Sequence, residues 1–257
     1  ATGLAFASGN AGALHACAHD ANTAMVLALA EYAAARREEL PRNVLFLFQP
    51  SEETTGGAQR LCETGILGKY RAARVFAMHL WPKLEQGEVY CRPGPIMARS
   101  NEVTVTLTGK SVHIGKAPEG IDALAAGAEY LLRAYAMAEA LPGEEPVVLR
   151  FGKMASGSVR NAISGKTVLE GSLRTFRDGT QDLCRQRLEE IGREIALETG
   201  CGAEVFLNEG YPAVWNHEGL YETVRAGLGE HAPRLLAAPT LTAEDFSFYQ
   251  RRVPGLF

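Results

Sequence analysis

The sequence lacks the features that mark membrane-spanning, secreted and nucleic-acid-binding proteins. No apolar run reaches the ~20 residues that a membrane-spanning helix needs. The first residues, Ala1-Thr2-Gly3-Leu4, contain neither the basic region of a signal peptide nor an initial Met, so we expect the chain to begin inside a longer gene product. The formal net charge is only -4, which excludes a strongly basic nucleic-acid binder and an acidic tail.

The cysteines also lack the pattern of a disulfide framework. They are scattered and odd in number, at Cys17, Cys62, Cys91, Cys184 and Cys201. We therefore expect a reducing, cytoplasmic setting. Four of them are explained as small packed residues. Cys17 differs because it lies two residues from His19.

The chain is long enough for one or two domains, since 46% of its 257 residues are hydrophobic. Asp20 is expected to cap a helix over residues 20–39. Continuous apolar runs at residues 44–48 and 75–80 predict strands buried on both faces, with a helix at 57–63 between them. This alternation predicts an α/β fold with a mostly parallel sheet flanked by helices.

The pattern changes near residue 99. Residues 102–108 alternate with period two, as in a strand with one exposed face. Further helices are predicted at 121–141 and 180–199, and further strands at 147–151, 166–176 and 203–207. The order β-α-β-β-α-β is that of a ferredoxin-like domain, which we place as an insert at residues 99–209. A helix predicted at 218–228 resumes the α/β pattern, so the other domain is discontinuous, at residues 1–98 and 210–257.

Three segments carry candidate metal ligands. The first is His15-Ala16-Cys17-Ala18-His19-Asp20, where Cys17 and His19 would share one face of an extended segment. A buried Cys beside a helix-capping Asp20 is the alternative. The other two segments follow the two apolar runs and carry Glu52-Glu53 and His79.

Adjacent carboxylates at the carboxyl end of a strand lie where open α/β sheets bind ligands. Glu52 and Glu53 would repel each other there unless a cation were present. With a metal, one can ligate while the other stays free as a base. Alternatively, Glu52 and Glu53 lie in a solvated loop or cap the following helix. His79 would then be an ordinary histidine packed in the core. Together, N, S and O donors at equivalent positions of one predicted sheet favour a hydrolytic transition-metal site.

These motifs resemble the M20 metallopeptidase family, especially the amidohydrolases that act on N-acyl amino acids, hippurate and auxin–amino-acid conjugates. The resemblance covers nearly the whole chain in order. Its residues are His15-Ala16-Cys17-Ala18-His19-Asp20, Phe48-Gln49-Pro50-Ser51-Glu52-Glu53, Met78-His79-Leu80, Gly109-Lys110-Ser111-Val112-His113, Arg160-Asn161-Ala162-Ile163, Gly171-Ser172-Leu173-Arg174-Thr175-Phe176 and Glu244-Asp245-Phe246-Ser247.

The resemblance implies a zinc-peptidase-like catalytic domain that holds two divalent ions, zinc or manganese, with nickel or cobalt also allowed. The implied metal ligands are Cys17, His19, Glu53 and His79. Glu52 would be the general base and acid, and the insert would be a lid and dimerisation domain. The implied substrate contacts are His113 and Asn161, reaching the partner subunit's active site, and Arg174, binding the substrate carboxylate. The alternative is that none of the three contacts a substrate. His113 would then be a surface residue, Asn161 a turn residue and Arg174 a residue at the edge of a strand.

The chain departs from the family at three places. Ala18 replaces the usual Gly between the Cys and His ligands, and Asn22 stands where the family often has His. The family also supplies one more His ligand from a segment that would follow Phe257. Neither His217 nor His231 lies in the expected context.

The sequence therefore predicts a cytoplasmic, metal-dependent amidohydrolase that cleaves the amide bond of small N-acyl amino acids. It would act as a homodimer, with no nucleic-acid or membrane partner. A Cys17 thiolate favours zinc or a similar borderline ion over magnesium or calcium. Two alternatives stay open, namely a non-catalytic binding or regulatory member of the family and a dipeptidase or carboxypeptidase of the family.

Overall fold

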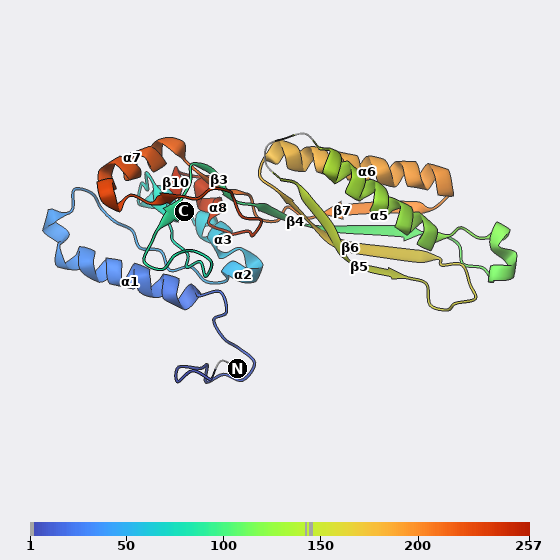
Figure 1. Cartoon of the computed structure of the whole chain (residues 1–257), viewed down its shortest axis with the longest axis horizontal. Helices are drawn as coiled ribbons and strands as arrows, with labels where there is room; N and C mark the ends of the chain where they lie inside the picture. Colours follow the sequence, from blue (N-terminus) through green and yellow to red (C-terminus); the bar gives the residue numbers. More distant parts are fainter. Residues whose placement is uncertain (1–2, 142, 144–145) are drawn as a thin grey trace.

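The structure is a computed structural model that describes residues 3–141, 143 and 146–257. The molecule is elongated and has two lobes, which are joined where strand β4 (Arg99–Thr108) begins (Figure 1). We name as the first lobe the part built from residues up to 98 and from 208 onward, and as the second lobe the part built from residues 99–207. In the described residues no helix combines the length and apolarity needed to cross a membrane.

The first lobe is built from short elements. Its helices are α1 (His19–Ala35), α2 (Glu52–Thr55), α3 (Gly57–Glu63), α4 (Ile66–Lys69), α7 (Glu218–Leu228) and α8 (Ser247–Gln250), with 3-10 turns η1 (Arg37–Glu39) and η3 (Gly229–His231). Its strands pair as β1 (Val75–Phe76) with β10 (Gly255–Leu256), β2 (Tyr90–Cys91) with β9 (Arg234–Leu235) and β3 (Gly94–Met97) with β8 (Val214–Asn216). The first two pairs are parallel and the third is antiparallel.

The prediction of an α/β fold is confirmed for this lobe, but the extent of the parallel sheet is wrong. Residues 44–48 form no strand in the described structure, and Val44 and Phe48 are 49% and 52% exposed. The second apolar run pairs only at Val75–Phe76, so His79 lies in a loop beyond the strand. A strand needs a neighbour for its backbone hydrogen bonds, and an apolar run does not specify that neighbour.

Helix α1 begins one residue earlier than predicted. Ala18 occupies the N-cap position in the left-handed conformation, with φ 59° and ψ 26°, and no side chain caps the helix. Asp20, the predicted cap, lies instead in the first turn, where its charge favours the helix dipole. The segment from Cys17 to His19 is therefore a turn into a helix and not the extended segment that the sequence predicts.

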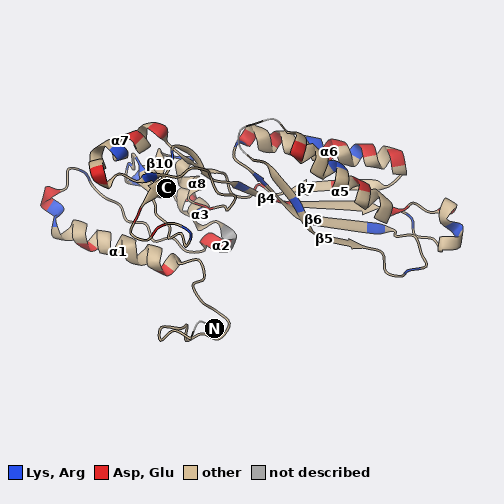
Figure 2. Ribbon diagram, viewed as in Figure 1, with Lys and Arg blue, Asp and Glu red and all other residues tan. Residues whose placement is uncertain are grey.

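The second lobe has the predicted order of elements. They are β4 (Arg99–Thr108), η2 (Ile114–Glu119), α5 (Ala123–Ala140), β5 (Val148–Ser156), β6 (Lys166–Thr175), α6 (Asp178–Thr199) and β7 (Gly202–Leu207). The antiparallel sheet has the strand order β5-β6-β4-β7, and α5 and α6 cover one face (Figure 1). Figure 2 shows Lys and Arg interspersed with Asp and Glu along α6.

The pattern of alternation explains how the second lobe packs. Val103, Val105 and Leu107 of β4 are fully buried under the helices with Tyr130 and Leu188, while the residues between them face the open side of the sheet. Asp122 caps α5 by accepting hydrogen bonds from the backbone N–H groups of Leu124 and Ala125. A rigid sheet therefore extends away from the first lobe.

The two lobes meet at a backbone bridge. The amide of Ser100 donates to the carbonyl of Tyr211 at 3.1 Å, and the amide of Tyr211 donates to the carbonyl of Ser100 at 3.2 Å. Asp178 at the start of α6 forms ion pairs with Arg99 and with Arg251, the residue that follows α8. This junction brings the base of the sheet next to α2, which carries Glu52 and Glu53.

Candidate metal centre

Cys17 and His19 converge through the turn at Ala18. The left-handed conformation of Ala18 reverses the chain direction just before α1, so that both side chains reach the same space. This conformation costs an L-amino acid with a Cβ roughly 1–2 kcal/mol. A glycine at this position would avoid the cost.

His79 approaches the same space from the loop after β1. Its Nδ1 lies 2.7 Å from the carbonyl oxygen of Leu80. Because a carbonyl can only accept, Nδ1 carries the proton and Nε2 presents a lone pair. Asn22 of α1 steadies this loop by accepting a hydrogen bond from the amide of Leu80 at 3.3 Å. A hydrogen bond of this kind on the far nitrogen is typical of a metal-binding histidine.

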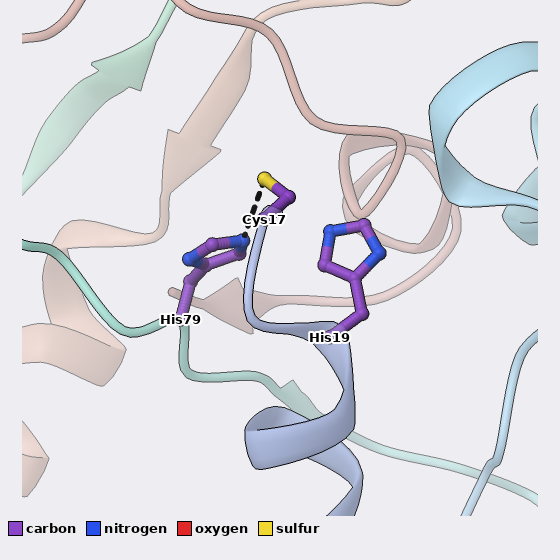
Figure 3. Close-up of side chains that lie close together, drawn as sticks. All are labelled: Cys17, His19 and His79. Atoms are coloured by element: carbon purple, nitrogen blue, oxygen red, sulfur yellow. Dashed lines mark hydrogen bonds between the residues drawn. The ribbon is translucent and has the colours of Figure 1, made fainter. Parts of the chain in front are cut away.

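Figure 3 shows Cys17, His19 and His79 gathered around one point. The Sγ of Cys17 lies 3.6 Å from Nε2 of His79, and one donor atom from each of the three residues lies within 4.8 Å of the others. Two ligands at 2.0–2.3 Å from one tetrahedral ion lie about 3.5 Å apart. The spacing of the sulfur and nitrogen therefore fits a shared zinc-like ion.

Glu52 and Glu53 also lie close to His19. The Nε2 of His19 is 3.5 Å from Oε2 of Glu52 and 3.7 Å from Oε1 of Glu53, and these three residues form a second group of donors within 4.8 Å. His19 is thus common to both groups. In the described residues its Nε2 is buried and has no hydrogen-bond partner. A buried orphan nitrogen is costly unless a ligand satisfies it, and a cation would do so.

Sequence reasoning missed Glu244 and Asp245 as members of the site. Both are buried, at 8% and 1% exposed, and their carboxylates form a third donor group with Glu52. A second adjacent acidic pair, placed directly before the aromatic Phe246, was the available signal. The sequence gives no indication that this pair lies beside the first one, because 192 residues separate Glu52 from Glu244.

Burial and neighbouring negative charges raise the pKa values of Glu52 and Glu244. Burial raises the pKa of Glu52, and the charges of Asp245 and Glu53 raise it further. Burial, with the charges of Glu52 and Asp245, raises the pKa of Glu244 to about 8. The pKa of the Cys17 thiol is also raised, by burial and then by Glu53. Such an excess of negative groups is the environment in which a bound cation is most stabilising.

The donor set also fits a metal chemically. A thiolate, two imidazoles and a carboxylate form the mixed soft and borderline set that binds zinc and similar ions. Cys17, His19, His79 and Glu53 are the residues that would hold such ions. Glu52 shares its neighbourhood with Asp245 and Glu244 as well as with His19.

The structure does not bring His113 and Asn161 to this centre. They meet each other, because the amide of Ile114 donates to the carbonyl of Asn161 at 2.9 Å and His113 pairs with Ala162. Their meeting point follows the ten residues of β4, so it lies roughly 30 Å along the sheet from the junction (Figure 1). Any contact of these residues with a substrate at this centre would therefore require another copy of the chain.

Arg174 lies at the opposite end of the same sheet. It pairs with Ser100, the residue that bridges to Tyr211, and the Tyr211 hydroxyl donates to the carbonyl of Glu52 at 2.7 Å. Partial burial lowers the pKa of Arg174. Within the described residues it has no hydrogen-bond or ion-pair partner. A half-buried, unpaired guanidinium facing the open side of the sheet near Glu52 fits an anionic ligand group.

Comparison with known proteins agrees with this geometry. The family model of peptidase family M20/M25/M40 matches residues 1–257. An N-acetyldiaminopimelate deacetylase of Lacticaseibacillus casei is 32% identical over 260 residues, which cover 99% of this chain and 67% of the relative. An N-acetyldiaminopimelate deacetylase of Shouchella clausii is 29% identical, with 99% and 68% covered.

Solved structures share the whole arrangement. The YXEP protein of Bacillus subtilis, a dinuclear metal-binding peptidase of the M20 family, has a TM-score of 0.82 and 29% identity, and the match covers 100% of this chain and 66% of that one. A protein from methicillin-resistant Staphylococcus aureus has a TM-score of 0.92 and 28% identity, with 100% and 67% covered. The chain thus spans about two thirds of the length of these proteins. It belongs to peptidase family M20/M25/M40, a family of metal-dependent hydrolases that cleave amide bonds.

Proposed function

We propose that this protein hydrolyses the amide bond of N-acyl amino acids, with N-acetylated amino acids as the first class to test. Two divalent ions would be held by Cys17, His19, Glu53 and His79, with zinc or manganese as the first candidates. The observation that carries the proposal is the position of His19, which belongs to both the sulfur–nitrogen group and the carboxylate group, and whose buried Nε2 has no partner among the described residues.

The chemistry divides between the ions and Glu52. Bound divalent ions lower the pKa of a water molecule and polarise the amide carbonyl. Glu52 accepts the proton of the attacking water and then donates it to the leaving nitrogen, which converts the amide into a carboxylate and a free amine. Its raised pKa suits the first of these steps, because a carboxylate of ordinary acidity would be a weaker base toward the attacking water.

Two features support an amino-acid substrate. The relatives named N-acetyldiaminopimelate deacetylase act, by their name, on an N-acetylated amino acid. Arg174 supplies an unpaired cation near Glu52, which suits the carboxylate that every N-acyl amino acid carries. The position of His113 and Asn161 at the far end of the second lobe supports a homodimer, in which they would contact the substrate held by the partner subunit.

The test is a direct assay. The purified protein is loaded with zinc or manganese, its metal content is measured, and N-acetyl, N-benzoyl and indole-acetyl amino acids are offered alongside a panel of dipeptides. Release of the free amino acid with two ions per chain supports the proposal. Cleavage of dipeptides alone would make it a peptidase. Stoichiometric metal and tight substrate binding without turnover would make it a binding protein.

A further inference from the structure

The segment that carries Glu52 and Glu53 has an unusual local structure. Helix α2 is a single turn between two left-handed residues, Ser51 at φ 62° and Gly56 at φ 64°. Gly57 packs so tightly that a Cβ there would lie 1.8 Å from the carbonyl oxygen of Pro50. A non-glycine residue in the left-handed region persists only where its surroundings hold it. Two side chains from distant segments hold Ser51 and its neighbours.

Tyr211 spans the turn from outside. Its hydroxyl donates to the carbonyl of Glu52 at 2.7 Å and accepts from the amide of Gly56 at 3.0 Å. One oxygen thus joins the first residue of α2 to the residue that ends it. Its ring also contacts Gly56, where an added Cβ would meet Cε1 at 3.3 Å.

Asp245 holds the two flanks of the same segment. Its carboxylate accepts from the Gln49 side-chain amide at 2.9 and 2.8 Å, and from the backbone amide of Ala58 at 2.9 Å. The side-chain oxygen of Gln49, Oε1, accepts a hydrogen bond from the Tyr249 hydroxyl at 2.8 Å. Asp245 therefore joins the residue before the turn to the first turn of α3, across a contact that is fully buried.

We infer that Tyr211 and Asp245 are positioning residues, which together clamp residues 49–58 so that Glu53 faces His19 as a ligand and Glu52 stays free for proton transfer. Neither side chain needs to touch a substrate or an ion. Both come from segments more than 150 residues away in the sequence, so the catalytic turn acquires its shape only when these segments pack against it. This inference rests on the proposed function for its kinetic consequence, but the shape of the turn and its affinity for metal can be measured separately.

The test compares Tyr211→Phe and Asp245→Asn with two matched controls in the second lobe. Tyr135→Phe removes a hydroxyl that accepts from the amide of Phe151, and Asp122→Asn alters a carboxylate that caps α5. Zinc affinity is measured by competition with a chelator, and amide hydrogen exchange is followed at Gly56 and Ala58. Steady-state kinetics on an N-acetyl amino acid give kcat and KM at saturating metal.

We expect each positioning variant to bind zinc at least ~10-fold more weakly, the usual scale for residues that orient metal ligands. Tyr211→Phe should speed exchange at Gly56, Asp245→Asn should speed it at Ala58, and kcat should fall ~10-fold with KM nearly unchanged. The controls should leave all of these at the wild-type level. Unchanged zinc affinity and exchange in both variants would overturn the inference. A wild-type protein that binds zinc but cleaves no N-acyl amino acid would instead overturn the proposed function, and the zinc and exchange data would still decide on the clamp.

Discussion

The Nε2 atom of His19 lies 3.5 Å from Oε2 of Glu52, close enough for charge interaction but without a hydrogen bond between them. A histidine that serves as a ligand must leave this nitrogen unprotonated, so it cannot donate to the carboxylate. Glu52 is therefore beside the centre without being tied to it. Glu53 lies 3.7 Å from the same nitrogen, so the two carboxylates are alike in distance, and the proposed function separates them by role, with Glu53 as a ligand and Glu52 as the base.

Replacing Glu52 by Gln tests that separation. Glu52→Gln keeps the shape of the side chain but removes the group that accepts and returns the proton, so kcat should fall by at least ~100-fold. Metal content should stay at the wild-type level, because the proposed function makes Glu53 and not Glu52 the ligand. The matched variant Glu53→Gln should lose metal. Turnover that survives Glu52→Gln at the wild-type rate would remove Glu52 from the role of base.

Ala18→Gly should relieve the strain at the turn between Cys17 and α1. Glycine adopts the left-handed conformation at no steric cost, whereas Ala18 pays roughly 1–2 kcal/mol, and part of the gain is offset by the greater entropy of glycine in the unfolded chain. We expect a net stabilisation of up to ~1 kcal/mol in chemical denaturation. Ala24→Gly, at an exposed position inside α1, should destabilise the protein by ~1 kcal/mol. If the free energy of unfolding changed in the same direction in both variants, Ala18 would not be strained.

Local patterns were sufficient to predict most of the second lobe. The period-two alternation of β4 and the apolar stripes of α5 and α6 each specify one buried face, so element order follows from the sequence alone. Helix 218–228 has the predicted bounds, because Glu218 opens its first turn and Gly229 follows its last residue. The residues 44–48 show the limit, since an apolar run predicts burial but not the strand that must pair with it.

The candidate metal centre was likewise predictable only in part. Residue chemistry indicated thiol, imidazole and carboxylate donors in three segments, and the family resemblance implied Cys17, His19, Glu53 and His79 as the ligands. The structure brings these four residues into two donor groups that share His19. The left-handed turn at Ala18 could not be predicted, because alanine favours the helix and only the packed structure imposes a positive φ. Tyr211 carries no local pattern that marks it, and the motif Glu244-Asp245-Phe246-Ser247 does not indicate that Asp245 holds a distant turn.

Zinc binding should release a proton from Cys17. Burial, with the nearby Glu53, raises the pKa of this thiol, so it is protonated at pH 7 in the metal-free protein, whereas zinc binds the thiolate. Calorimetric titration in buffers of different ionisation enthalpy measures the released protons. Cys17→Ser should reduce the release by about one proton per chain. Cys62→Ser is the control, because the pKa of that thiol is also raised but it lies outside the donor groups. Equal proton release by the wild type and Cys17→Ser would exclude the thiolate as a ligand.

Arg174 should recognise the substrate carboxylate. A charged hydrogen bond of this kind contributes ~1.5–3 kcal/mol, so Arg174→Ala should lower kcat/KM for an N-acetyl amino acid by ~10–100-fold. The loss should vanish for the matching N-acetyl amino-acid amide, which has no negative charge. Arg150→Ala, on the neighbouring strand, removes a guanidinium paired with Glu139 and should affect neither substrate. An equal loss on both substrates would show that Arg174 acts on the fold and not on the carboxylate.

Glu244 should make the stability of the metal-free protein fall as the pH rises. Its pKa is about 8 in the folded chain against 4.5 for an ordinary glutamate, so between these values the folded state binds more protons than the unfolded state. The contribution of the protonated Glu244 to the free energy of unfolding is therefore complete below pH 4.5. It is lost progressively up to about pH 8, because above its pKa a buried charge must form. Glu244→Gln keeps the shape without the charge, so its advantage over the wild type should grow by on the order of 2 kcal/mol between pH 5 and pH 8.

Denaturant titrations of the metal-free protein across this pH range measure the effect. Glu230→Gln is the control, since that side chain is 90% exposed and its replacement should leave the pH profile unchanged. Added zinc should reduce the difference between Glu244→Gln and the wild type, because bound cations stabilise the ionised carboxylate and lower its pKa. A metal-free wild type whose stability rises from pH 5 to pH 8 in parallel with that of Glu244→Gln would show that the Glu244 carboxyl ionises as easily as one in water. The crowded carboxylates would then not be the reason that this site binds a cation.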